Sequence, residues 1–379
     1  MMIYLDYSAT TPVLDEVLDS YNKVTKEYIG NANSIHSLGT KSKVLLNSAT
    51  KQICDLFSIE EDELIFTSGA TESNNMALKG VAESYIRNGK HIVVSKLEHP
   101  SIYKICEYLE RKGYEIDYVD NNQEGLIDFE DLKNKVREDT IIVSICAVNS
   151  EVGIRQPLKT LRQIIKKENP NTIFHSDMTQ AIGKVQVNMH DVDMASCSGH
   201  KFYAPKGIGF LYKNKKVNIE PLIHGSGKFN ELRLGTPPLP LIVSLSKALR
   251  IALQDLDKKE EYVSELNNSL CKEFEKYNGL IINKTGYSIP NILSISLMNI
   301  KPETFVHALE ENEVYVSTNT ACSSGDISTA IMAIYNDKKR AMGTIRISLS
   351  YLTTQDQITK FIKIFKNEYN KLNEFLGEN

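Results

Sequence analysis

The segment Ser198-Gly199-His200-Lys201 lies between two short apolar runs and decides how the rest of the chain is interpreted. The run before it, Asp193-Met194-Ala195-Ser196-Cys197, and the run after it, Gly207-Ile208-Gly209-Phe210-Leu211-Tyr212, each predict a buried strand. A lysine between two buried strands is unusual, because charged side chains are rarely buried without a partner or a chemical role. For this segment alone, a solvated lysine in a polar turn is the favoured interpretation, so the rest of the chain must show whether Lys201 has such a role.

One chemical role that suits a lysine in this place is a Schiff base with pyridoxal 5'-phosphate (PLP). The amine must lose its proton easily, and desolvation and neighbouring cationic groups make this possible. Ser198 and His200 would then lie beside the phosphate of the cofactor as hydrogen-bond donors.

Strand and helix patterns alternate through the first two thirds of the chain. Apolar strands that alternate with helices predict an α/β fold, with a mostly parallel sheet sandwiched between helices. Ligands of such sheets bind at the carboxyl ends of the strands. The predicted strands are 64–67, 92–95, 115–119, 141–145 and 172–175, and the predicted helices are about 13–28, 40–57, 76–85, 101–112, 128–136 and 157–168.

The last third of the chain has a different pattern, which predicts a smaller α+β domain. A long helix over about 241–277 carries the chain out of the first domain, and strands near 291–298 and 345–349 follow. A chain of 379 residues is long enough for two domains. We expect a large domain over 13–254, and a small domain formed by 1–12 with 255–379. No flexible linker separates them, so they should pack tightly.

The loops after the predicted strands carry polar residues. Ser68 to Asn75 leaves one strand and opens a helix, so backbone N–H groups and the Thr71 hydroxyl meet at a helix N-terminus. This arrangement suits a phosphate, although an ordinary capped turn explains it equally well. Glu98-His99, Asn149-Ser150-Glu151 and 176–180 follow other strands. Because all these loops converge on one edge of the sheet with Lys201, they favour a cofactor site there.

Composition excludes several classes of function. Forty-four basic and 48 acidic residues give a net charge of −4 without a basic block, so nucleic acid is not expected as a direct ligand. The N-terminus has no signal-peptide pattern, and no apolar run approaches the roughly 18 residues that span a bilayer. We therefore expect a soluble, cytoplasmic protein with no membrane partner.

The six cysteines are scattered without CxxC spacing, which argues against a metal site or a disulfide framework. Five of them lie in helical or strand-like runs, where cysteine is usually a small core residue. Cys322 differs, because it lies in the small, polar loop 318–326.

Together these motifs resemble the cysteine desulfurases of the class V aminotransferase family, which have fold type I among PLP enzymes. The resemblance covers essentially the whole chain, and its motifs occur in the family order. They are Tyr4 to Pro12, Phe66 to Ser73, Ser198 to Lys201 and Ser317 to Cys322.

The resemblance implies a role for each residue around the cofactor ring. Lys201 is the Schiff-base lysine, and Asp177 pairs with the ring nitrogen and keeps it protonated, so that the ring accepts electrons. His99 stacks on the ring and relays protons, and Gln180 donates to the 3-oxygen of the ring.

The resemblance also implies residues for the phosphate and the substrate. Ala70, Thr71, Ser198 and His200 hold the phosphate. Thr236 reaches the phosphate of the neighbouring subunit, which implies a homodimer. Asn149 and Arg346 bind the amino acid, with Arg346 holding its carboxylate in a fork geometry.

Cys322 matches the nucleophile of the family. Its thiolate would attack the sulfur of bound L-cysteine, which leaves L-alanine and a persulfide on Cys322. His99 is the candidate for deprotonating Cys322. The sulfur would pass to an acceptor protein, such as an iron–sulfur scaffold or a tRNA-thiolating enzyme.

The sequence departs from the family pattern at several positions. The family has Pro, Asn, Ser and usually Gly where this chain has Ala32, Ser150, Leu234 and Asn319. Residues 323–343 also lack the usual Pro and Arg-Ala-Leu-Gly elements, which places sulfur delivery in question. Alternatives are a PLP-dependent aminotransferase, a selenocysteine lyase, and a scaffold or regulator that no longer transfers sulfur. Cys322 argues against the aminotransferase, which needs no nucleophile in that loop.

Overall fold

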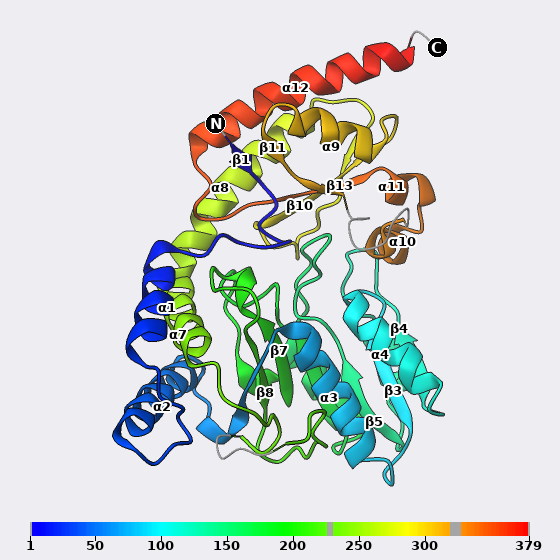
Figure 1. Cartoon of the computed structure of the whole chain (residues 1–379). Helices are drawn as coiled ribbons and strands as arrows, with labels where there is room; N and C mark the ends of the chain where they lie inside the picture. The colour runs from blue at the N-terminus through cyan, green and yellow to red at the C-terminus, as the bar shows by residue number, and fades with distance from the viewer. Residues whose placement is uncertain (1, 226–229, 319–326, 378–379) are drawn as a thin grey trace.

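The computed structural model describes residues 2–225, 230–318 and 327–377. A seven-stranded sheet with its helices forms the lower part of the molecule in Figure 1, and a four-stranded sheet with its helices lies above it. The helices α7 (Leu239–Leu253) and α8 (Leu256–Phe274) run from the lower part to the upper part. The division into domains at 12/13 and 254/255 stays a prediction.

The seven-stranded sheet has the order β2-β8-β7-β6-β5-β3-β4. The five strands from β7 to β4 are parallel, whereas β8 pairs antiparallel with both β7 and β2. The α/β class with a mostly parallel sheet is thus confirmed. The strands are β2 (Leu64–Thr67), β3 (His91–Ser95), β4 (Glu115–Val119), β5 (Thr140–Ser144), β6 (Ile173–Asp177), β7 (Met194–Ser198) and β8 (Gly209–Lys213).

Helices cover both faces of this sheet, which explains why its inner strands are apolar throughout. The helices α3 and α4 pack on one face, and α1, α2, α6 and α7 share a hydrophobic core with the other. The helices are α1 (Asp15–Glu27), α2 (Ser37–Phe57), α3 (Ala70–Ser84), α4 (Pro100–Glu110), α5 (Phe129–Lys135) and α6 (Leu158–Glu168). Short 3₁₀ turns lie at η1 (Glu61–Glu63), η2 (Met189–Asp191) and η3 (Gly199–Lys201).

The upper part is built on an antiparallel sheet of order β12-β13-β10-β9. Phe274, Phe305 and Phe365 are buried in its core, and the ring of Phe365 contacts the other two. The remaining elements are β1 (Ile3–Tyr4), β9 (Leu280–Ile282), β10 (Ile292–Leu297), α9 (Pro302–Glu310), β11 (Val314–Tyr315), β12 (Ser317–Thr318), α10 (Thr329–Tyr335), α11 (Lys338–Met342), β13 (Thr344–Ser348) and α12 (Gln355–Gly377).

Two predicted helices were wrong in their limits. The single helix expected over 241–277 is two helices, because Asp255 adopts a left-handed conformation with φ of 51° that ends the regular hydrogen-bond ladder. The helix expected from residue 76 begins at Ala70. The polar residues before 76 were read as a turn, but Ser73 and Asn74 are fully buried on the helix face toward the sheet, and Ser73 donates to the Phe210 carbonyl.

The N-terminal segment is more ordered than the expected irregular run from residue 4. β1 pairs in parallel with β11 of the upper part, and the chain then crosses to the edge of the large sheet. In the part of the chain that the structure describes, no helix is long and apolar enough to cross a membrane.

Candidate functional site

The predicted lysine and aspartate lie at the carboxyl ends of neighbouring parallel strands. Asp177 is the last residue of β6 and pairs in register with Ser196 of β7, while Lys201 ends the 3₁₀ turn that follows β7. The Nζ of Lys201 donates to the carbonyl oxygens of Ser8 and Ala9, each at 2.7 Å. The sheet therefore holds the amine of Lys201 at the edge where ligands of this fold bind.

The N-terminal segment is bound at this edge through its backbone. The Thr11 N–H and hydroxyl both donate to the carbonyl of His200, at 2.9 and 3.1 Å, and the His200 ring contacts the Thr10 hydroxyl. Burial, with Lys201 as a further cause, lowers the pKa of His200 to about 4. His200 is therefore neutral near pH 7 and can serve as a hydrogen-bonding group for an anion.

Asp177 is buried, and both of its carboxylate oxygens are held in place. One oxygen accepts from Asn74 Nδ2 at 2.9 Å and the other from the Thr179 N–H at 3.0 Å. Asn74 also donates to the hydroxyl of Ser101 at 3.0 Å. Asn74 was missed in the sequence because it lies in a polar run that looked like a turn.

His99 caps α4 and lies within electrostatic range of Asp177 and Lys201. Its Nδ1 accepts from the Ser101 N–H at 3.1 Å, so a neutral ring carries its proton on Nε2. Desolvation lowers the pKa of His99, Asp177 opposes that shift and Lys201 adds to it. The imidazole is therefore neutral at pH 7, with the Nε2–H available to a ligand.

The expected phosphate residues lie around the N-terminus of α3. Ala70 and Thr71 form its first turn. The Ser198 hydroxyl lies beside the start of the helix, because a Cβ atom added to Gly69 would be 3.2 Å from it. Glu72 in the same turn is paired with Arg233 at 3.1 Å and accepts from the Ser68 N–H. The arrangement offers the backbone N–H groups of a helix start together with hydroxyl donors.

The two predicted substrate residues already have partners within the chain. Asn149 Nδ2 donates to the Leu97 carbonyl at 2.9 Å. Arg346 donates to the Ser150 carbonyl at 2.9 Å and to the Asp6 carboxylate at 3.1 Å. Its Nε is buried and has no hydrogen-bond partner among the residues that the structure describes. A substrate carboxylate at Arg346 would therefore share the guanidinium with Asp6, a partner that no sequence pattern indicates.

Two predicted residues are not placed with the others. Thr236 is exposed, in the loop before α7. Cys322 lies outside the described residues. Of the other cysteines, Cys54, Cys106, Cys146 and Cys197 are buried, as expected for core residues, and Cys271 is partly buried.

Glu98, the residue before His99, is a buried carboxyl to which the sequence analysis assigned no individual role. One of its oxygens accepts from the Ser95 hydroxyl at 2.7 Å and from the Cys146 N–H at 2.5 Å. The other has no hydrogen-bond partner in the described part of the chain. Burial raises the pKa of Glu98 to about 8, and the negative charge of Asp177 adds to the shift. Glu98 is therefore protonated in the folded protein near pH 7.

The contribution of Glu98 to stability should consequently fall as the pH rises from about 4.5 to about 8. In that window an unfolded Glu98 releases its proton while the folded one keeps it, so the unfolded state is favoured with rising pH. Glu98→Gln should remove this slope and gain on the order of a few kcal/mol above pH 8 relative to the wild type. Urea unfolding at pH 5 and pH 9 measures the effect, and equal slopes for both proteins would contradict it.

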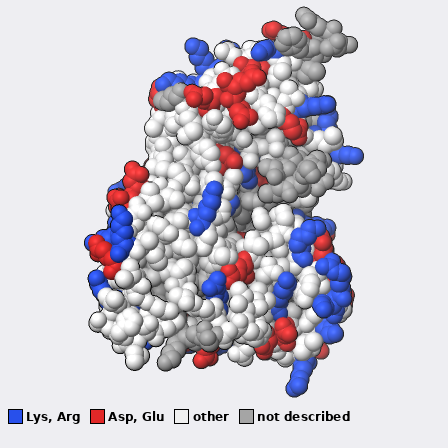
Figure 2. Space-filling model, viewed as in Figure 1, with Lys and Arg blue, Asp and Glu red and all other residues white. Residues whose placement is uncertain are grey.

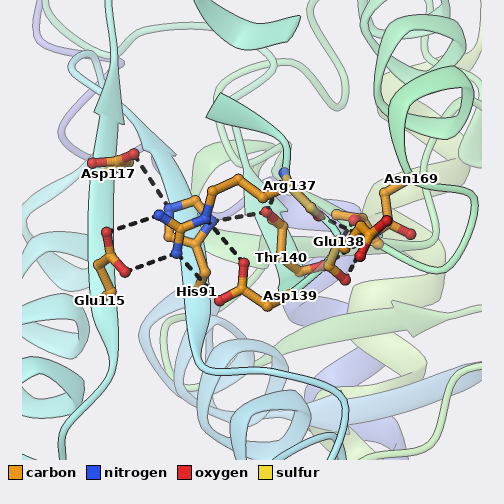
Figure 3. Close-up of polar contacts among 9 residues, drawn as sticks. His91, Glu115, Asp117, Arg137, Glu138, Asp139, Thr140 and Asn169 are labelled. Atoms are coloured by element: carbon orange, nitrogen blue, oxygen red, sulfur yellow. Dashed lines mark hydrogen bonds and ion pairs between the residues drawn. The ribbon is translucent and has the colours of Figure 1, made fainter. Parts of the chain in front are cut away.

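A second polar cluster lies at the opposite ends of β3 and β4 (Figure 3). His91 is fully buried with its Nε2 3.3 Å from Asp117, and the carboxylate of Glu115 is close by. Arg137 donates to both Glu115 oxygens at 2.9 and 2.7 Å, and also pairs with Asp139. Because the guanidinium already binds both oxygens of Glu115, we interpret this cluster as an ion-pair network.

Comparison with known proteins shows the family to which the chain belongs. Residues 3–361 match the family described as class V aminotransferases. The chain belongs to this family. A cysteine desulfurase IscS of Dictyoglomus turgidum is 38% identical over 98% of this chain and 95% of that protein. A cysteine desulfurase IscS of Escherichia coli O139:H28 is 35% identical, over 98% and 94%.

Solved structures of the family agree with this assignment. A NifS-like protein superposes with a TM-score of 0.93 at 35% identity, covering 98% of this chain and all of that one. A structure titled SspA in complex with cysteine has a TM-score of 0.79 at 29% identity, covering 93% and 99%. The predicted resemblance and fold type are thus confirmed, and the chain is a cysteine desulfurase.

Members of this class V family depend on PLP, so we asked whether the residues present fit that cofactor. PLP has an aldehyde, a ring nitrogen and a phosphate. At one edge of the sheet the chain offers the Lys201 amine, the Asp177 carboxylate and the start of α3, where Gly69 keeps the backbone open beside Ser198. Each chemical group of PLP has a matching residue, and the site fits the cofactor.

Proposed function

We propose that the protein binds PLP at this edge and converts L-cysteine to L-alanine, with transfer of the sulfur to Cys322 and then to an acceptor protein. The observation that carries the proposal is the placement of Lys201 and Asp177 at the ends of adjacent parallel strands, beside the α3 N-terminus. When bound, PLP supplies an electron-withdrawing ring that allows bonds at the substrate carbons to break.

The chain's own residues would hold the cofactor and the substrate. Lys201 would bind PLP through its amine, Asp177 would keep a proton on the ring nitrogen, and Gln180 would donate to the 3-oxygen. Backbone N–H groups at Ala70 and Thr71, with Ser198 and His200, would bind the phosphate. Asn149 and Arg346 would orient the amino acid, and His99 would lie over the ring.

The sulfur transfer belongs to Cys322. Its thiolate attacks the sulfur of bound cysteine, an S–S bond forms, and the carbon–sulfur bond breaks with its electron pair left on carbon. That carbon then takes a proton and becomes the methyl group of alanine. Only a thiolate is nucleophilic enough for this step, so a base must accept the proton of Cys322. His99 is neutral and can accept this proton on its Nδ1. The hydrogen bond from the Ser101 N–H to that nitrogen must then break.

Asp177→Asn should keep the fold and bind PLP, but lose most of its activity. An amide cannot stabilise a protonated ring nitrogen, and the loss of one preorganised electrostatic partner costs about two to three decades in rate. Alanine formation from cysteine, measured at saturating PLP, tests this. Near-normal turnover by the variant would remove Asp177 from the mechanism.

A homodimer is part of this proposal, because Thr236 would complete the phosphate site of the partner. The chain from α1 to α2 carries several exposed large apolar side chains, and the surface over α2 is largely uncharged in Figure 2. Ile35 is 98% exposed, which is unusual for an isoleucine that has no partner. The exposed apolar residues of this segment are Leu18, Ile29, Ile35, Leu38 and Val44.

The double variant Ile35→Asp, Val44→Asp should therefore dissociate the dimer. Burying two carboxylates in an interface should weaken association by roughly a hundredfold. Sedimentation velocity over a concentration series measures this, with the exposed Ile86→Asp as a control that should stay dimeric. A wild-type monomer at micromolar concentration that still turns over cysteine would contradict the dimer.

A further inference from the structure

Lys184 is a buried lysine at the site that the proposed reaction does not use. It is 7% exposed and ends the turn that follows β6. In the residues that the structure describes, its ammonium donates to the side-chain oxygen of Gln180 and pairs with no carboxylate. Burial lowers the pKa of Lys184 to about 7, with the charges of Lys201 and Arg346 as further causes. Burying an ammonium group without a counter-ion lowers the stability of the fold. We therefore expect Lys184 to have a role that offsets this cost.

The turn is built to bring this lysine inward. Gly183 has φ of 77°, and an added Cβ there would lie 3.0 Å from the Cβ of Phe202 and 3.1 Å from that of Ala252. Only glycine satisfies both the left-handed backbone and the close approach. Lys184 consequently lines a small cavity together with Lys201.

The hydrogen bonds of Gln180 show what the lysine does. In its protonated form Lys184 can only donate, so the ammonium must face the amide oxygen of Gln180 and not the amide nitrogen. The Nε2 of Gln180 is then turned the other way, where it donates to the Ser8 carbonyl at 2.9 Å. The same carbonyl accepts from Lys201 at 2.7 Å. The Gln180 amide has nearly the same shape in its two flipped orientations. Lys184 selects one of them.

We propose that Lys184 is a positioning residue that fixes the amide of Gln180 with its N–H donors toward Ser8 and the cofactor site. Without Lys184 the amide can flip and present its oxygen to that carbonyl, which would repel it. The flip would loosen the N-terminal segment over Lys201 and replace the donor expected for the 3-oxygen of PLP with an acceptor. The inference rests on the proposed function, since it gives Gln180 a cofactor contact.

Three variants and a matched control test it on the PLP-loaded full-length enzyme. Lys184→Met keeps the length of the side chain but removes the donor, and Gln180→Met removes the amide. Gln180→Glu keeps the shape and the contact with Lys184 but has no donor for Ser8. Lys213→Met is the control, because Lys213 is also 7% exposed and donates to a carbonyl, at 2.8 Å, but lies at the opposite end of the sheet.

We expect Lys184→Met to lower kcat and to weaken PLP binding, each by roughly tenfold to a hundredfold, and to shift the visible absorption band of the bound cofactor. Gln180→Met and Gln180→Glu should show the same changes, and the double variant Lys184→Met, Gln180→Met should be no worse than Gln180→Met alone. Lys213→Met should change only the melting temperature.

Two outcomes would overturn the inference and leave the proposed function intact. One is additive losses in the double variant, which would mean that Lys184 acts independently of Gln180. The other is normal PLP binding and an unshifted band in Lys184→Met or Gln180→Glu. Failure of the wild type itself to bind PLP or to form alanine from cysteine would instead contradict the proposed function.

Discussion

Lys201→Ala is expected to lose covalent attachment of PLP and to lower alanine formation by roughly a thousandfold or more. A methyl group cannot form the bond to the cofactor, and Lys201 lies where the carboxyl ends of β6 and β7 place a ligand. Borohydride reduction of the loaded enzyme, followed by digestion and mass spectrometry, should find the cofactor mass on the Lys201 peptide of the wild type and on no peptide of the variant.

The lysine also holds the carbonyls of Ser8 and Ala9, so its loss could act through the N-terminal segment alone. Lys201→Arg separates the two effects, because arginine can still donate to carbonyls but cannot attach the cofactor. It should be as inactive as Lys201→Ala, whereas Lys206→Ala, at an exposed position nearby, should behave as the wild type. Attachment to another lysine would show that the site is misassigned.

Cys322→Ser is the second variant with a large expected effect. It should bind PLP normally and respond to added cysteine with a change in visible absorbance, since neither step uses the thiol. Sulfide release in the presence of a reductant should fall by roughly a thousandfold or more, because a serine hydroxyl is far less acidic than a thiol and does not replace a thiolate.

Cys271→Ser is the matched control, because Cys271 is partly buried whereas the other described cysteines are buried. It should release sulfide at the wild-type rate. Undiminished sulfide release by Cys322→Ser would defeat the mechanism. Transamination of cysteine with no sulfide from either protein would instead favour the aminotransferase alternative.

The fold was largely predictable because apolar strands and helices alternate in the sequence. The limits of β2 and β4 agree with the predicted 64–67 and 115–119, since each strand ends at a clear change in polarity. The break between α7 and α8 was not predictable, because the helical pattern continues through Asp255 with no glycine or proline.

The site was predictable only where residue type carries the chemistry. Lys201, Asp177 and His99 stand out as polar residues at strand ends. The contacts that hold them do not, because they come from backbone carbonyls such as those of Ser8 and Ala9, which no side-chain pattern reveals. The Gln180 to Lys184 bond is similarly hidden, since it depends on the inward turn at Gly183.

Mass spectrometry of the wild-type enzyme after brief exposure to cysteine, without reductant, tests the central claim most directly. The account predicts one added sulfur atom per chain, located on the Cys322 peptide, and one alanine formed for each sulfur retained. An added sulfur on Cys54, Cys106, Cys146, Cys197 or Cys271 instead, or alanine formed without any sulfur on the protein, would contradict it.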